Sequence, residues 1–380
     1  MNKKINVCFL IGTLNVGGAE RQLVELVRHL NKEQFTITVV VLRNEGALRD
    51  DVRACDGVRL ISLDQHRRWD LLRSTTKLQQ LLKRENPKII HAFLPGANFF
   101  AFWVGSLLGK KRMIWSIRAS YLDLSAYSWP IKLLIPLNAR LSKWIDCIVY
   151  NSQAGRKYHE ARGYTGRRAL VIPNGIDTEC FSPQPHIREQ ERQKLGLSND
   201  TPVIGMVGRI DRNKDHHTFL EAASILHETM PETRFLLIGE GDEKLLQQLM
   251  KKMDELDLDR VVYWLGFRND IPRLLSSLDV NTSTSIGEGF PNVVAEAMAC
   301  GVPCVVTDVG DSAVIVGDTG IVVPSREPQA LATAWKNVLQ MSFDERCRLG
   351  EKARSRIVDN FSLEKVITMY EKLYRELCLI

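Results

Sequence analysis

Short apolar runs alternate with amphipathic stretches along almost the whole chain. The runs are rich in Val and Ile and too short for helices, which is typical of buried strands. Helical spacing fills the intervals, as in Leu23, Val27 and Leu30, which share one helix face. Continuous apolar strands separated by helices indicate parallel sheets covered on both faces. The predicted strands are Ile5–Ile11, Phe35–Leu42, Ile89–Phe93, Arg112–Ile117, Cys147–Tyr150, Leu170–Ile172, Val203–Val207, Arg234–Ile238, Val261–Leu265, Val280–Thr284, Pro303–Val306 and Gly320–Val323.

A polar interval divides these strands into two series. Residues 181–200 contain two prolines and follow a turn-rich segment. We therefore predict an N-terminal domain over residues 1–180, a linker over 181–200 and a C-terminal domain over 201–361, each a doubly wound α/β domain. Residues 362–380 carry one apolar stripe, and we expect a helix that packs back on the first domain. Ligands of such sheets bind beyond the carboxyl ends of the strands, which predicts a site in a cleft between the domains.

Charge is distributed unevenly, although the net charge is only +6. Residues 1–180 hold 28 Lys or Arg against 15 Asp or Glu, whereas the other 200 residues hold 23 against 30. The first half therefore faces something acidic, either an anionic membrane surface or a phosphate-bearing substrate. Nucleic acid is disfavoured as a partner, because the basic surplus belongs to no recognised module and the second half is acidic.

Cysteine usage and hydropathy favour a cytoplasmic protein. The eight cysteines form no CxxC pair and have no histidine at zinc-ligand spacing, so we expect reduced thiols. The basic start and short apolar run at the N-terminus predict a first strand rather than a signal peptide. Residues 89–109 lack formal charge, but Pro95 and Gly96 interrupt them, which favours a buried strand followed by a buried helix over a membrane span.

Two loops that follow predicted strands could bind phosphate. Gly17 and Gly18 lie where the first strand passes into a helix, and bare N–H groups at a helix amino end attract phosphate. A plain strand-to-helix turn is the alternative. Arg209 and Lys214 follow the strand Val203–Val207, where two cations could hold a pyrophosphate. The alternative there is a solvated basic loop.

A third segment carries two carboxylates eight residues apart. Glu288 ends a strand-to-loop segment, Pro291 is suited to open a helix, and Glu296 follows among apolar neighbours. Burying Glu296 without a ligand would be unfavourable. The two carboxylates could therefore hydrogen-bond to separate polyhydroxy groups. The alternative is an ordinary helix with a surface carboxylate.

These segments resemble the family 4 retaining glycosyltransferases of the GT-B type. The resemblance runs nearly from end to end and implies two Rossmann-like domains facing across a cleft. It is carried by the GGAE loop, by I-P-N-G-I-D-T-x-x-F-x-P at Ile172–Pro183, by G-R-x-x-x-x-K at Gly208–Lys214, by G-E-G at Gly239–Gly241, by L-G-F at Leu265–Phe267 and by E-x7-E at Glu288 and Glu296.

The resemblance also implies roles for individual residues. Glu288 would contact the transferred sugar and Glu296 the ribose, while Arg209 and Lys214 would stabilise the departing diphosphate. The implied catalytic residues are Arg209, Lys214 and Glu288. The implied donor-binding positions are Gly17, Gly18, Gly208, Gly239, Phe267, Arg268, Gly289, Phe290, Pro291, Asn292, Val293, Val294 and Glu296.

The implied reaction is a front-face displacement with retention, in which the acceptor hydroxyl attacks on the side that the nucleotide leaves. Glu288 as a nucleophile is the alternative. No Asp-x-Asp motif follows a predicted strand, so neither a divalent metal nor a cofactor beyond the donor is expected. Arg118 occupies the place where many relatives carry a histidine, and we assign it to the acceptor side. Pro291 replaces a common glycine and removes one N–H from the sugar loop.

The acceptor side shows a mixture of aromatic, apolar and basic residues. Tyr121–Trp144 combines all three kinds, and Lys110–Arg112 lies close in sequence. Such segments suit the headgroup layer of an anionic membrane. A buried helix pair with a basic rim is the alternative.

We therefore expect a transferase that moves a hexose or N-acetylhexosamine from a nucleotide sugar, with UDP favoured, to a lipid-linked or saccharide acceptor in surface-glycan synthesis. It would act in the cytoplasm, peripherally on the anionic inner-membrane surface. The alternatives are a sugar-nucleotide epimerase of the same architecture and a non-catalytic scaffold subunit of a glycosyltransferase complex.

Overall fold

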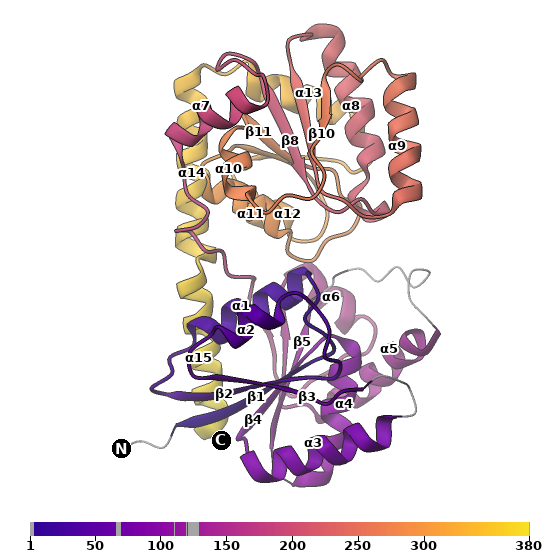
Figure 1. The fold of residues 1–380 in the computed structure, drawn as a ribbon, viewed down its shortest axis with the longest axis vertical. Coiled ribbons are helices and arrows are strands. Elements are labelled where there is room, and N and C mark those ends of the chain that lie inside the picture. The colour runs from indigo at the N-terminus through magenta and orange to yellow at the C-terminus, as the bar shows by residue number, and fades with distance from the viewer. Residues whose placement is uncertain (1–3, 66–69, 110, 119, 121–128, 380) are drawn as a thin grey trace. The chain divides into compact units, whose positions relative to one another are not determined.

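A computed structural model describes residues 4–65, 70–109, 111–118, 120 and 129–379. The chain forms two compact units (Figure 1). Unit 1 comprises Met1–Gly175 together with Leu363–Ile380, and unit 2 comprises Ile176–Ser362.

Unit 1 contains a seven-stranded sheet in the order β3-β2-β1-β4-β5-β6-β7, and every pair is parallel. Its strands are β1 (Ile5–Ile11), β2 (Phe35–Val41), β3 (Val58–Ser62), β4 (Ile89–Phe93), β5 (Arg112–Ile117), β6 (Cys147–Tyr150) and β7 (Ala169–Val171). Its helices are α1 (Gly18–His29), α2 (Arg49–Arg53), α3 (Leu71–Glu85), α4 (Pro95–Gly105), α5 (Trp129–Leu141), α6 (Gln153–Glu160) and α15 (Leu363–Leu379), with 3-10 turns η2 (Ser106–Leu108) and η4 (Ser142–Trp144).

Alternating side chains of β1 supply two cores on opposite faces of this sheet. Val7 and Phe9 pack with the helices α1 and α15, whereas Cys8 and Leu10 pack on the side of α3 and α4. Helices therefore cover both faces, as a parallel sheet requires. The terminal helix α15 buries seven side chains in the first of these cores.

Unit 2 contains a six-stranded parallel sheet in the order β10-β9-β8-β11-β12-β13. Its strands are β8 (Val203–Val207), β9 (Arg234–Ile238), β10 (Val262–Trp264), β11 (Val280–Ser283), β12 (Cys304–Thr307) and β13 (Ile321–Val323). Its helices are α7 (Pro185–Lys194), α8 (His216–Thr229), α9 (Glu243–Glu255), α10 (Ile271–Ser276), α11 (Asn292–Ala299), α12 (Ser312–Val316), α13 (Pro328–Leu339) and α14 (Phe343–Phe361), with the 3-10 turn η5 (Arg212–Lys214).

The structure contains all twelve predicted strands, with ends that differ by at most a residue or two, and both sheets are parallel as predicted. It adds one strand, β3, which the sequence analysis missed. The uncharged run at residues 89–109 forms β4, α4 and η2, with a helix that is largely buried. Within the described residues, no helix combines the length and the hydrophobicity needed to cross a bilayer.

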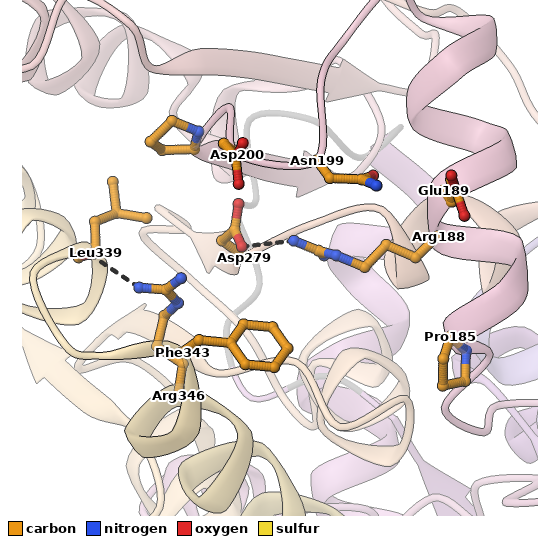
Figure 2. Close-up of a pocket in the computed structure, with 10 residues that line it drawn as sticks. Pro185, Arg188, Glu189, Asn199, Asp200, Asp279, Leu339, Phe343 and Arg346 are labelled. Carbon is orange, nitrogen blue, oxygen red and sulfur yellow. Dashed lines mark hydrogen bonds and ion pairs between the residues drawn. The ribbon is translucent and has the colours of Figure 1, made fainter.

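The predicted linker over 181–200 differs from the structure. Unit 2 already starts at Ile176, and α7 folds as part of it. The reason is Arg192, whose side chain is completely buried and donates to Asp279 Oδ2 at 2.7 Å and to Ser277 O at 3.0 Å. Arg188 of the same helix donates to Asp279 Oδ1 at 2.7 Å (Figure 2). A polar helix is therefore fixed to the sheet by charge-assisted hydrogen bonds rather than by an apolar face.

We expect Asp279→Ala to lower the free energy of unfolding of unit 2 by about 3–5 kcal/mol, because it leaves a buried guanidinium unpaired. Burial already lowers the pKa of Arg192, which shows how unfavourable the site is for a lone cation. Urea unfolding followed by circular dichroism measures the change. Glu255→Ala is the control, since it breaks only the exposed pair with Lys251 and should cost less than about 1 kcal/mol. Equal losses in the two variants would contradict the assignment.

Candidate functional site

In the sheet of unit 2, the order in which the chain connects neighbouring strands reverses between the two central strands, β8 and β11. From β8 the chain continues to β9 and β10 on one side, and from β11 it continues to β12 and β13 on the other. Ligands of doubly wound sheets bind beyond the carboxyl ends of the strands at such a switch point. The loops that follow β8 and β11 carry Lys214 and Glu288, so topology alone brings these two predicted residues to one place.

Lys214 and Glu288 form an ion pair at this switch point. Lys214 Nζ lies 2.5 Å from Glu288 Oε1, and the two side chains are only 19% and 14% exposed. Ser285 Oγ donates to the same oxygen at 2.8 Å. The carboxylate is thus held by two donors in a partly dry setting, where such hydrogen bonds are stronger than in water.

A second set of contacts fixes the backbone of the two loops to each other. Thr284 Oγ1 donates to the carbonyls of Lys214 and Asp215 at 2.7 and 3.0 Å. Ile286 N donates to Asn213 O at 2.8 Å. These hydrogen bonds attach the loop that carries Lys214 to the end of β11.

The predicted glycines bring the backbones of two further loops close together. A Cβ on Gly239, which has φ +144°, would lie 1.9 Å from Gly208 O. Only glycine permits this approach. On its other side, Gly208 lies beside the aliphatic stem of Lys214, because a Cβ there would be 3.5 Å from Lys214 Cδ. Trp264, the last residue of β10, donates its Nε1–H to Gly239 O at 3.2 Å and so holds the loop of Gly239 in place.

The loop at Glu288–Pro291 is anchored through its backbone. Asp311 N donates to Gly289 O at 3.0 Å. Gly310, at φ +59°, passes so close that a Cβ there would lie 2.3 Å from Glu288 O. The side chains of Phe290, Pro291 and Val294 are buried, and Phe290 packs edge-on against Phe361. Phe290, Pro291 and Val294 can therefore offer a ligand their backbone but not their side chains.

The helix α11 begins directly after this loop. Pro291 is its N-cap and Asn292 its first residue, so the proline stands one position before the helix rather than inside its first turn. Asn292, Val293 and Glu296 are half-buried, whereas the other residues of this helix are buried. Asn292 and Glu296 are one turn apart and share a helix face.

Three predicted positions lie at the surface of unit 2. Arg209 is 79% exposed and pairs with Asp211, Nη2 to Oδ2, at 3.2 Å. Phe267 is half exposed. Arg268 forms a two-pronged pair with Asp270 at 2.8 and 2.6 Å. An exposed pair such as that of Arg209 is weak, so its guanidinium is able to reorient toward an anion.

The sequence analysis missed several residues that build this site. His216, the first residue of α8, is buried and stacks on Trp264 with ring centroids 5.8 Å apart. Burial, together with the charge of Lys214, lowers the pKa of His216 to about 4, so it stays neutral near pH 7. Thr284 and Ser285 were missed too, although polar residues at the end of an apolar strand were a usable signal.

The remaining predicted residues belong to unit 1. Gly17 is the N-cap of α1 and Gly18 its first residue. Arg118 follows β5 and donates to Asn174 Oδ1 and to the hydroxyl of Tyr370 in α15, both at 2.8 Å. Its guanidinium lies over the ring of Phe93, 5.1 Å from the centroid. A buried Nε of Arg118 has no hydrogen-bond partner among the described residues.

Leu94 marks the corresponding switch point of unit 1, between β1 and β4. It adopts φ 75° and ψ 154°, a region that L-residues enter only under strain of order 1–3 kcal/mol. Its carbonyl accepts from Asn98 N at 2.9 Å as α4 begins. The following proline favours the extended ψ but not the positive φ.

A cavity of about 550 Å³ in unit 2 lies elsewhere (Figure 2). Pro202 and Asp279, which line it, directly precede β8 and β11, so it opens at the amino edge of the sheet. Lys214 and Glu288 follow these two strands, at the opposite edge. The cavity is bounded by the contacts of Arg188 that hold α7.

Metal-ligand clusters and disulfides are absent from the described structure. No three His, Cys, Asp or Glu side chains gather there as a metal site. All eight cysteines are free thiols, and burial raises the pKa of Cys8, Cys147, Cys300 and Cys304 to about 12. These four thiols act as small apolar core residues.

Comparison with known proteins agrees with this architecture. The model of the family "Glycosyltransferase Family 4" matches residues 16–180, and that of "Glycosyl transferases group 1" matches residues 187–356. The UDP-Gal:alpha-D-GlcNAc-diphosphoundecaprenol alpha-1,3-galactosyltransferase of Escherichia coli is 25% identical over 377 residues, which cover 94% of each chain. The lipopolysaccharide core biosynthesis glycosyltransferase LpsE of Rhizobium meliloti is 26% identical and covers 94% of this chain and 95% of its own.

Solved structures share the fold. Alr3699/HepE of Anabaena in complex with UDP superposes with a TM-score of 0.85 at 21% identity, covering 98% of this chain and all of the other. The two parallel sheets with their covering helices have the fold of a GT-B glycosyltransferase. The chain belongs to the group 1, family 4 glycosyltransferases and is a transferase enzyme.

We expect Gly239→Ala to lower turnover of the nucleotide-sugar donor on the order of 10²-fold, because the added methyl displaces Gly208 and with it the stem of Lys214. Release of the nucleoside diphosphate measures the effect. Gly196→Ala is the matched control, since that glycine also has a positive φ, +70°, but has open space around it. The assignment fails if the two variants lose activity equally.

Proposed function

We propose that this enzyme transfers a hexose or N-acetylhexosamine, with retention, from a UDP-sugar to a lipid-linked or saccharide acceptor in surface-glycan synthesis. The observation that carries the proposal is the ion pair of Lys214 and Glu288 at the switch point of unit 2. It combines a cation for a diphosphate with a carboxylate for sugar hydroxyls, and both are partly shielded from water.

The choice of UDP is supported by two of the similar proteins. The Escherichia coli relative is a UDP-Gal-dependent transferase, and the Anabaena neighbour has been solved with UDP and with UDP-glucose. On this chain, the half-exposed ring of Phe267 and the arginine beside it offer an open position for a base. Glu296, half-buried on α11, would accept from the ribose hydroxyls.

The departing diphosphate would be stabilised by protein cations and backbone dipoles, without a divalent metal. Lys214 is already held near the carboxyl ends of β8 and β11, and Arg209 is exposed and can swing in from its weak pair with Asp211. Preorganised donors of this kind account for much of the rate enhancement in transfer reactions.

A positioning role for Glu288 is favoured over a nucleophilic one. Its Oε1 accepts from both Lys214 and Ser285, and these donors fix the orientation of the carboxylate and draw charge from it. This arrangement supports front-face attack by the acceptor hydroxyl.

The acceptor would bind to unit 1, where Arg118 at the end of β5 takes the place of the family histidine. Three contacts, with Asn174, Tyr370 and Phe93, hold its guanidinium in one orientation. A fixed cation there suits an acceptor with phosphate groups, such as a lipid-linked diphosphate at the cytoplasmic face of the inner membrane.

We expect Arg209→Ala and Lys214→Ala each to lower turnover by about 10²–10³-fold, the usual effect of removing one charge-stabilising donor. Donor turnover under saturating conditions is the measurement. Arg212→Ala serves as the control, because Arg212 is an exposed cation in the same loop with no assigned role. Near-normal turnover in both test variants would refute the assignment.

We expect UDP to stabilise the protein more than GDP or ADP does. At about 100 times its Kd, a ligand contributes about 2.7 kcal/mol, which raises Tm by roughly 5–10 °C for a unit of this size. Differential scanning fluorimetry with each nucleotide tests the base.

Turnover in EDTA should stay within about twofold of the untreated value. A loss that added Mg²⁺ restores would overturn metal independence.

A further inference from the structure

Two neighbouring helices of unit 1 expose large apolar side chains. On α4 and η2, Trp103 is 55% and Leu107 62% exposed; on α5 and η4, Leu133 is 62% and Trp144 48% exposed. Leu137, also exposed, lies one turn after Leu133 on the same face. We call these five residues the α4–α5 face. Residues 121–128, which were part of the predicted membrane segment, lie outside the described structure.

The two helices are in contact, and a pocket lies between them. The helices α4 and α5 pack on each other, and Asn138 of α5 donates to Pro95 O at 2.9 Å. Phe102 bridges the two sides, with its ring centroid 6.0 Å from that of Trp144. Between them lies an open pocket of about 360 Å³. Its lining is apolar except for one hydroxyl and comprises Phe102, Ser106, Met113, Leu141 and Trp144.

The charged residues of these two helices and their 3-10 turns are all cations. They are Lys132 and Arg140 of α5 and Lys143 of η4, whereas α4 and η2 carry no charged residue. Lys132, Arg140 and Lys143 are exposed and form no ion pair with any described residue. Lys143 Nζ lies 4.2 Å above the ring of Trp144, so a cation stands directly at the rim of the pocket. Apolar groups surrounded by unpaired cations are complementary to an anionic lipid surface.

The position of the pocket separates it from the transfer reaction. Met113 is the second residue of β5, and Trp144 comes shortly before β6, so the pocket lies toward the amino edge of the sheet. Arg118 lies at the opposite, carboxyl edge, roughly 16 Å away along the strand. A lipid in the pocket would therefore be a membrane lipid rather than the reacting acceptor.

We infer that the α4–α5 face is a membrane-binding surface whose pocket takes one hydrocarbon chain of an anionic phospholipid, with its phosphate near Lys143. The inference rests on the proposed function, because transfer to a lipid-linked acceptor is the reason for this enzyme to bind a membrane. Binding to lipid itself does not require transfer, so the two can be tested apart.

The first test is flotation of the full chain with vesicles of phosphatidylcholine containing 30% phosphatidylglycerol. We expect binding at low salt that falls at least fivefold in Trp103→Ser/Leu107→Ser, and equally in Lys132→Glu/Lys143→Glu. The controls are Leu72→Ser/Met250→Ser, two exposed apolar residues elsewhere, and Lys352→Glu. Binding that is absent, or that the controls reduce as much, overturns the inference.

The second test separates chain insertion from adsorption. Ser106→Trp fills the pocket while it adds apolar surface and leaves every cation in place. A face that merely adsorbs to lipid would bind more tightly in this variant, whereas a face that takes a chain should bind at least threefold more weakly. Tighter binding overturns the pocket assignment.

Two further measurements distinguish the remaining outcomes. If a second copy of the chain covers the face, light scattering will show a dimer that Trp103→Ser/Leu107→Ser dissociates, and the inference is then wrong. Thermal stabilisation by UDP should be unchanged in all surface variants, because the donor residues lie in unit 2. Lipid binding without any nucleotide binding would refute the proposed function and leave the membrane surface standing.

Discussion

The ion pair of Lys214 and Glu288 is the interaction on which the donor side is organised. It joins the loops after β8 and β11. These two central strands form the switch point of unit 2, because successive strands are added on one side of β8 and on the other side of β11. Its position depends on residues that would not themselves react. Thr284 holds the backbone of Lys214, Ser285 donates to the carboxylate, and glycines let the backbones of the loops approach each other. A charge pair buried to this extent is stable only when such neighbours complete its hydrogen bonds.

Much of the fold could be predicted because buried parallel strands are apolar along their whole length. Ile89–Phe93 and Val203–Val207 match the structure residue for residue. The strand β3 was missed since it is an edge strand, half-exposed, and interrupted by Arg59, so its pattern resembles a loop. The segment 181–200 was wrongly predicted as a linker for the opposite reason: α7 is polar, and its attachment depends on the buried Arg192, which no hydropathy pattern reveals.

The candidate site was predictable only as far as motifs and strand ends allow. Lys214 and Glu288 were identified and do meet, because both follow central strands. The sequence could not show that Phe290 and Val294 turn their side chains into the core, nor that Arg209 stands out in solvent. His216 was interpreted only as a residue at a helix start, because its contact with Trp264, 48 positions away, comes from tertiary packing. Such contacts between distant positions are set by tertiary packing, which local patterns do not encode.

The helix α15 has a consequence for how the molecule is made. Its buried stripe, including Tyr370 and Tyr374, completes a core whose other members lie within the first 175 residues. On the ribosome, unit 2 is synthesised in full before α15 leaves the exit tunnel, so the domain that starts first is finished last. Until then, α1 covers only part of this face of the sheet, and His91 lacks the hydroxyl of Tyr374 as a hydrogen-bond partner. Nascent chains of this enzyme should therefore be prone to aggregation until α15 has emerged and packed.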